Sequence, residues 1–254
     1  MKRLLILVGL AVSFIAGCNK IDKDSFQISG ELNNGAEKPL YFLEMTGQGL
    51  KPLDTIIIDN KGKFKFSYKL QEASIFVLLA NPNDYITIIP NKQEDIIING
   101  YFNALSSSYT IKNSKDSELL HKLNQEYINT NAILAEIKQT LHENKYSENI
   151  DQVKENLLEQ YNILEIRQRS IIKKFIDTNK GSLACIIALY RLFDNHYLFS
   201  LTNDLNVYEQ VYEQLNKTYP NNQHTIGLKN LIEKAKLKSQ QDTIENKSKL
   251  ANKK

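Results

Sequence analysis

The stretch KFKFSYKLQEASIFVLLA, residues 63–80, decides the fold class of this chain. In its first part, Phe64, Phe66 and Tyr68 alternate with lysine and serine, which is typical of a strand with one buried face and one wet face. Its last part, SIFVLLA, is apolar on both faces of the strand that it would form. This part therefore predicts a central strand that is covered on both faces, with helices supplying one of the covers.

Six further segments before residue 113 show the same period of two or short β-branched runs between Asn, Asp, Gly and Pro. They are FQISGEL (26–32), PLYFLEM (39–45), LDTIIID (53–59), YITII (85–89), DIIING (95–100) and SYTIK (108–112). About eight strands in so short a stretch predict an antiparallel β-sandwich or an open barrel. The turn Asp59-Asn60-Lys61-Gly62 is predicted to join two of them as a hairpin, because Asn and Gly tolerate positive φ.

Past residue 113 the apolar residues recur at helical spacing. A first helix is predicted from Leu120, Leu123, Tyr127, Leu134, Ile137 and Leu141, with Ser117 as its N-cap. After the polar break HENKYSEN, a second is predicted from Ile150, Val153, Leu157, Tyr161, Leu164, Ile171 and Phe175. Two long amphipathic helices with a short connection predict an antiparallel hairpin.

Gly181 and Ser182 predict a helix stop and a new N-cap. The segment that follows, LACIIALYRLF, residues 183–193, is apolar almost all round and predicts a short buried helix. Further helices are expected over residues 205–215 and 225–237.

These elements predict an α+β fold. Its parts are expected to be a signal peptide (1–17), a tether (18–25), an antiparallel β-sandwich-like domain (26–113), a helical hairpin or bundle (114–238) and a disordered, lysine-rich tail (239–254). The sheet and the helices are expected to pack as one unit, because the link near Asn113 is short and contains no Pro or Gly.

The charge distribution argues against nucleic-acid binding. The 254 residues carry a formal net charge of +3, but residues 18–232 contain 23 basic and 26 acidic side chains. The basic excess therefore lies at the two ends of the chain. A nucleic-acid-binding domain would be expected to carry a basic stripe on its folded face.

The first residues read as a lipoprotein export signal. Lys2 and Arg3 precede an apolar run of about 13 residues, which is shorter than the roughly 20 that a spanning helix needs. The run ends in Ile15-Ala16-Gly17-Cys18, which resembles the bacterial lipobox. That resemblance implies cleavage before Cys18 and lipidation of its thiol, with acylation, such as by palmitate, of the new amino terminus. Several chains give a stable membrane anchor, expected at the outer membrane, on its periplasmic or surface side.

The rest of the chain contains no recognisable catalytic, cofactor or metal residues. Cys185 is the second of two cysteines and lies in an apolar segment, so a buried inert thiol is expected rather than a reactive one. The four histidines, His121, His142, His196 and His224, show no metal-ligand spacing and are expected to be surface or capping residues. The tyrosines at helical spacing read as half-buried core residues, with a ligand-stacking surface as the alternative.

The segments FQISGEL, PLYFLEM, LDTIIIDNKGKFKFS and SYTIKNSKDSELLHKLN resemble the domain of unknown function 4369. In bacteroidete-type lipoproteins this module commonly precedes a thioredoxin-like domain of the TlpA and AhpC/TSA kind, and SLACIIALYRLF and VYEQVYEQLNKTYPNNQH resemble the region that joins the two. Those relatives carry a WCxxC motif, whereas this chain has no Trp and only Cys185 besides Cys18. A dithiol cycle within this chain is therefore not expected.

These observations predict a non-enzymatic, lipid-anchored cell-envelope protein that acts as a binding or scaffolding module. Its expected partners are the membrane, through the anchor, and a thioredoxin-like envelope protein. The alternative is a single-thiol accessory of envelope thiol–disulfide exchange, acting through Cys185. A third reading is a truncated thioredoxin-family oxidoreductase.

Overall fold

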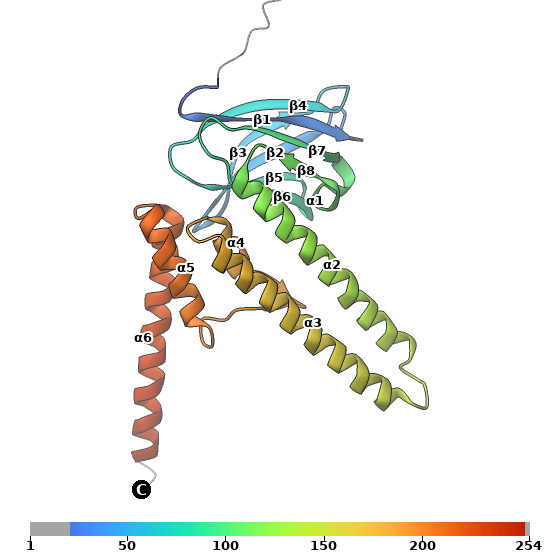
Figure 1. Cartoon of the computed structure of the whole chain (residues 1–254), viewed down its shortest axis with the longest axis vertical. Coiled ribbons are helices and arrows are strands. Elements are labelled where there is room, and N and C mark those ends of the chain that lie inside the picture. The colour runs from blue at the N-terminus through green and yellow to red at the C-terminus, as the bar shows by residue number, and fades with distance from the viewer. Residues whose placement is uncertain (1–20, 252–254) are drawn as a thin grey trace, which may run out of the picture.

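Eight strands form two sheets and are followed by a helical layer in the computed structural model, which describes residues 21–251 and the side chains of residues 21–242 (Figure 1). The first sheet has the order β4-β1-β7-β8, from β4 (Lys63–Lys69), β1 (Ser25–Asn33), β7 (Asp95–Tyr101) and β8 (Thr110–Lys112). The second has the order β3-β2-β5-β6, from β3 (Gly49–Ile57), β2 (Pro39–Thr46), β5 (Ile75–Asn81) and β6 (Asp84–Ile88). The predicted α+β fold is confirmed, and each of the eight predicted strand segments overlaps a strand, although β3 begins and ends earlier than the predicted segment 53–59.

Aromatic rings fill the space between the two sheets. The rings of Phe42 on β2 and Phe76 on β5 stack 5.1 Å apart, and Phe26 on β1 lies 5.6 Å from Phe76. On β4, Phe64 is buried while Lys63 is exposed, as the alternating sequence predicts. Face-to-face packing of this kind defines a β-sandwich.

The strand connections differ from the sequence prediction in two places. The turn after β3 is tight, with Gly62 at φ +82° and with the Asp59 carboxylate accepting from the backbone of Lys61 and Lys63 at 2.8 Å. It does not make the predicted hairpin, because β3 pairs with β2 and β4 pairs with β1, so the turn carries the chain from one sheet to the other. The pairing of β1 with β7 is parallel, whereas the other pairs within the two sheets are antiparallel.

Helices follow the sandwich and cover the second sheet. They are α2 (Lys115–Glu143), α3 (Ile150–Thr178), α4 (Ala184–Leu189), α5 (Leu205–Thr218) and α6 (Gln223–Ala251), preceded by two single turns, η1 (Phe102–Ala104) and α1 (Leu105–Ser108). The helices α2 and α3 form the predicted antiparallel hairpin and extend away from the sandwich (Figure 1). A buried hydrogen bond of 2.5 Å from Thr130 to Gln168 ties these two helices together.

A second apolar core joins the helices to the second sheet. Ile75 on β5 and Ile89, just after β6, are buried in the same cluster as helical residues such as Leu120. Polar contacts reinforce this junction: Ser117 Oγ accepts from the backbone of Ile89 at 2.9 Å, and Asn222 Nδ2 donates to the carbonyl of Ala73 at 2.6 Å. The strand β5 is thus covered on both faces, as SIFVLLA predicts.

Three helical predictions are wrong in detail. The helix α2 begins after Ser114, so Ser117 lies inside it, where its hydroxyl accepts from the backbone N–H of Ile89. The helix α4 ends at Leu189, and the next residues form a small hairpin of β9 (Leu192–Phe193) and β10 (His196–Tyr197), whose turn is made by Asp194 and Asn195 at positive φ. The helix α6 continues through most of the predicted disordered tail, residues 239–254, where neither Pro nor Gly interrupts the sequence.

Candidate functional site

A cavity of about 800 Å³ opens where the second sheet meets the helical layer. Its walls come from β6, α1, α2, α4 and α6 and from the turn after β2. The Asp84 carboxylate shapes one wall, because it accepts from the backbone of Leu105 at 2.8 Å and of Ser106 at 2.7 Å and so holds α1 against β6. The volume lies within the usual range for small-molecule sites, about 300–1,000 Å³.

The basic side chain in this cavity is that of Arg191, which follows α4. Its guanidinium donates to Asn124 Oδ1 and lies over the ring of Tyr127, 5.0 Å from the centroid. The amide of Asn124 is itself held, because its Nδ2 donates to the hydroxyl of the buried Tyr109 at 3.1 Å. The guanidinium is therefore positioned by two residues of α2, one of which is fixed by the sandwich side of the molecule.

Arg191 has no acidic partner. No aspartate or glutamate is among the described residues that line the cavity. Arg191 also takes part in none of the ion pairs between described residues of the chain. Its Nε is buried without a hydrogen-bond partner. Burial lowers the pKa of the Arg191 guanidinium. The nearby phenols of Tyr127, Tyr85 and Tyr109 partly oppose this shift, because they raise the pKa. A cation held this way is unfavourable unless an anion binds beside it.

His224 on α6 lines the same cavity and also lacks a partner. Its Nε2 is buried without a hydrogen bond, and burial lowers the pKa of the ring from its ordinary value. The imidazole is therefore neutral near pH 7. Two unsatisfied buried nitrogens in one cavity mark it as a candidate ligand site, because such groups in folded proteins are as a rule hydrogen-bonded.

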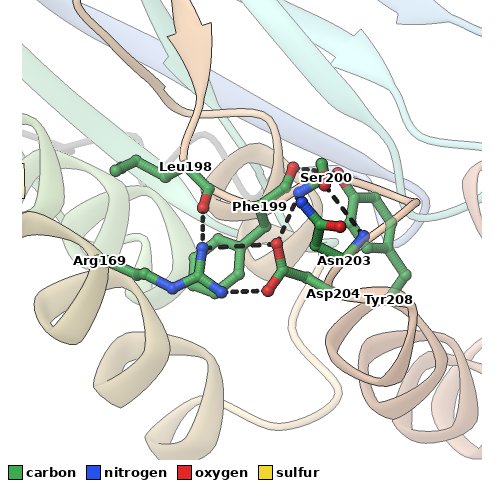
Figure 2. Close-up of polar contacts among 7 residues, drawn as sticks. All are labelled: Arg169, Leu198, Phe199, Ser200, Asn203, Asp204 and Tyr208. Atoms are coloured by element: carbon green, nitrogen blue, oxygen red, sulfur yellow. Dashed lines mark hydrogen bonds and ion pairs between the residues drawn. The ribbon is translucent and has the colours of Figure 1, made fainter. Parts of the chain in front are cut away.

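Arg169 on α3 provides the contrast, because its guanidinium is paired with an acid of this chain (Figure 2). It pairs with the Asp204 carboxylate, donates to the carbonyl of Leu198 and lies over the ring of Phe199, 4.4 Å from the centroid. Asp204 in turn accepts from the backbone N–H of Ser200 at 2.9 Å. We call this set, Arg169, Asp204 and residues 198–200, the Arg169 clamp.

The Arg169 clamp has a structural task. It fastens the loop between β10 and α5 to the side of α3, and Tyr208 closes the loop from α5 by donating to the carbonyl of Phe199 at 2.8 Å. The hollow of about 630 Å³ beside it also contains Lys173 and Asp177, which pair with each other at 2.6 Å. Arg169 and Lys173 are thus neutralised within the chain, and the remaining charge, Lys174, is exposed, so the hollow offers a ligand no buried, unpaired cation of the kind that Arg191 provides.

The thiol of Cys185 lies outside both hollows in a tightly packed environment. The side chain is buried, and its Sγ donates to the carbonyl of Asn179 at 3.2 Å. Burial, with Asp116 and Asp177 nearby, raises the pKa of the thiol to about 12. The predicted inert thiol therefore fits the structure, and a nucleophilic one does not.

We expect Cys185 to resist alkylation in the native state. In the Cys18→Ala chain it is the remaining thiol, and iodoacetamide at neutral pH should label it only after denaturation, because its thiolate is scarce and covered. A Ser107→Cys change in the same background places a thiol at an exposed site and serves as the positive control. Native labelling of Cys185 at the rate of this control would contradict the buried assignment.

Other residues singled out in the sequence are scattered. His142 is exposed and His196 contacts Glu165 at 2.9 Å, but His121 and His224 are half-buried, so the surface prediction is wrong for these two. Within the described part of the chain, no three His, Cys, Asp or Glu side chains gather as a metal site. Cys18 lies outside the described residues. Over residues 21–251, no helix combines the length and apolar character needed to cross a bilayer.

Sequence reasoning missed Arg191. The available signal is a single charge, the arginine, in the otherwise uncharged segment SLACIIALYRLF. The spacing of Tyr127 predicts a helix-core residue, with ligand stacking as the alternative, and the structure places its ring against Arg191 at the cavity.

Residues 26–120 match the family model described as Domain of unknown function (DUF4369). The match extends from β1 to the first turns of α2, so it includes the sandwich and excludes Arg191. No curated protein and no solved structure matches the chain.

Proposed function

We propose that this chain is a non-enzymatic binding module of the cell envelope, built from a DUF4369 domain and a helical layer. Its ligand occupies the cavity between the second sheet and the helices, which we call the Arg191 cavity. The observation that carries the proposal is the guanidinium of Arg191, which is held by Asn124 and Tyr127 yet has no acid beside it. A site whose polar groups are positioned but not satisfied is organised for something that binds from outside the chain.

The proposal includes a lipid anchor on Cys18. It is supported by the basic start, the short apolar run and the Ile15-Ala16-Gly17-Cys18 sequence. The anchor would hold the module at a membrane of the envelope, in our proposal the outer membrane, within reach of ligands there. A thioredoxin-like partner stays a prediction.

No observation favours the alternative in which Cys185 exchanges disulfides. That chemistry needs an accessible thiolate, whereas this thiol is covered and its pKa is raised to about 12. A binding role needs no nucleophilic or acid–base step in the cavity, whose lining consists of neutral polar and apolar side chains around Arg191 and the neutral His224.

Gly227 on α6 allows a sharp test of the cavity. It lines the cavity, and a Cβ built at this position meets no atom within 4 Å. A side chain at this position therefore begins in open space, and we expect Gly227→Trp to fill the cavity with its indole, whereas Gly227→Ala should leave the cavity open. Both replacements favour the helix, since glycine in a helix interior costs up to about 1 kcal/mol relative to alanine.

We expect the chain isolated from its own membrane fraction to carry a small molecule that native mass spectrometry detects. The Gly227→Ala chain should carry the same added mass and the Gly227→Trp chain should lose it, while Cys18→Ala should move the protein to the soluble fraction. An added mass that persists in Gly227→Trp would place the ligand elsewhere. A ligand that is chemically converted on incubation would contradict the non-enzymatic role.

A further inference from the structure

The charge in the cavity is a single unit. Arg191 is the one lysine or arginine among the described residues that line it, and they include no acid to neutralise it. A ligand with one negative charge would balance the site, whereas a dianion would carry a second charge into a site with no second cation.

The guanidinium has free donors for such a group. Asn124 takes one hydrogen bond from Nη2, and the structure gives Nη1 no partner among the described residues. The planar fork of an arginine matches the two oxygens of a carboxylate better than a point charge does. Because Tyr127 and Asn124 fix the plane of the guanidinium, little freedom would be lost when the anion binds.

Part of the wall is apolar or aromatic and suits a flat apolar body, while neutral polar side chains line the rest. Ile128, Ile187 and Leu231 line the cavity together with the rings of Tyr85 and Tyr127. Aromatic and aliphatic side chains of this kind bury the body of a small ligand, while a few polar groups fix its orientation.

We propose that the Arg191 cavity binds a small organic monocarboxylate with a flat apolar body, whose carboxylate pairs with the Arg191 guanidinium. This inference rests on the proposed function, since it names the ligand class of the same cavity. It adds that the negative charge of the ligand, and not only its shape, decides binding.

The test compares 2-naphthoate with its neutral counterpart 2-naphthamide. Both are titrated calorimetrically into the full chain, purified in a non-ionic detergent at pH 7.5. We expect one saturable site with at least tenfold tighter binding of the acid, which corresponds to 1.4 kcal/mol. Added salt should weaken binding of the acid more than binding of the amide, because it screens the ion pair.

Two arginine variants separate the site from general charge. Arg191→Gln should abolish the preference for the acid, and Arg167→Gln, which removes an exposed arginine on α3, should retain it. Equal binding of acid and amide, an unchanged preference in Arg191→Gln, or no saturable binding of the acid would overturn the inference. If both probes bind equally and Gly227→Trp blocks both, the carboxylate assignment fails while the cavity stands as the binding site. If Gly227→Trp blocks neither, the proposed function fails as well.

Discussion

Gly30→Ala is expected to destabilise the chain by about 3 kcal/mol or more. Gly30 lies on β1, where it is paired with Phe64 of β4 on one side and Ile98 of β7 on the other. A Cβ at this position would lie 1.6 Å from the carbonyl oxygen of Ile98, and a backbone atom in a paired strand cannot move aside as a flexible side chain can. The change should therefore force β1 and β7 apart.

Urea unfolding followed by circular dichroism measures this effect, with Gly47→Ala as the matched control. A Cβ at Gly47 meets no atom within 4 Å, so that change should alter the free energy of unfolding by less than about 0.5 kcal/mol. Equal unfolding midpoints for the two variants would show that β1 and β7 are not paired at the close distance seen here.

Arg169→Gln is expected to destabilise the chain by about 2 kcal/mol, whereas Arg191→Gln should change its stability by less than about 1 kcal/mol. The first change leaves the Asp204 carboxylate, whose side chain is 12% exposed, without its cation and leaves the Leu198 carbonyl without its donor. The second removes a hydrogen bond to Asn124 and the contact with Tyr127, but it also removes a half-buried cation that has no acidic partner.

The two variants are compared by urea unfolding of the ligand-free full chain. Both variants lose one positive charge through the same substitution. The difference between their free energies of unfolding therefore reports what each arginine contacts. A larger destabilisation from Arg191→Gln than from Arg169→Gln would mean that Arg191 holds the fold together, and it would remove the reason for assigning that residue to a ligand.

Local patterns predict the elements well because each depends on its own residues. The alternation of Phe64, Phe66 and Tyr68 with lysine predicts β4 and its buried face. The apolar run of β5 also predicts a strand that is buried on both faces. Glycine and serine at residues 181–182 likewise mark the start of α4, where Gly181 has φ +81° and Ser182 Oγ accepts from the backbone of Ala184.

Pairing between distant segments is not predictable from those patterns. The turn at residues 59–62 fixes a local reversal of the chain, but the choice of partner strand depends on which sheet each strand joins. The parallel pairing of β1 with β7 joins residues almost 70 positions apart, such as Gln27 and Asp95, and leaves no short-range signal. The candidate site is not predictable for the same reason. The residues that line the cavity around Arg191 come from distant segments, so its own segment does not show that no acid lies beside it.

A crystal structure of the chain isolated with the molecule it carries would show directly whether that molecule occupies the Arg191 cavity. We expect electron density in the cavity between the second sheet and the helices, in contact with the guanidinium of Arg191 and the ring of Tyr127. An unoccupied cavity, with the carried molecule bound at another surface, would contradict the claim that this cavity is the functional site.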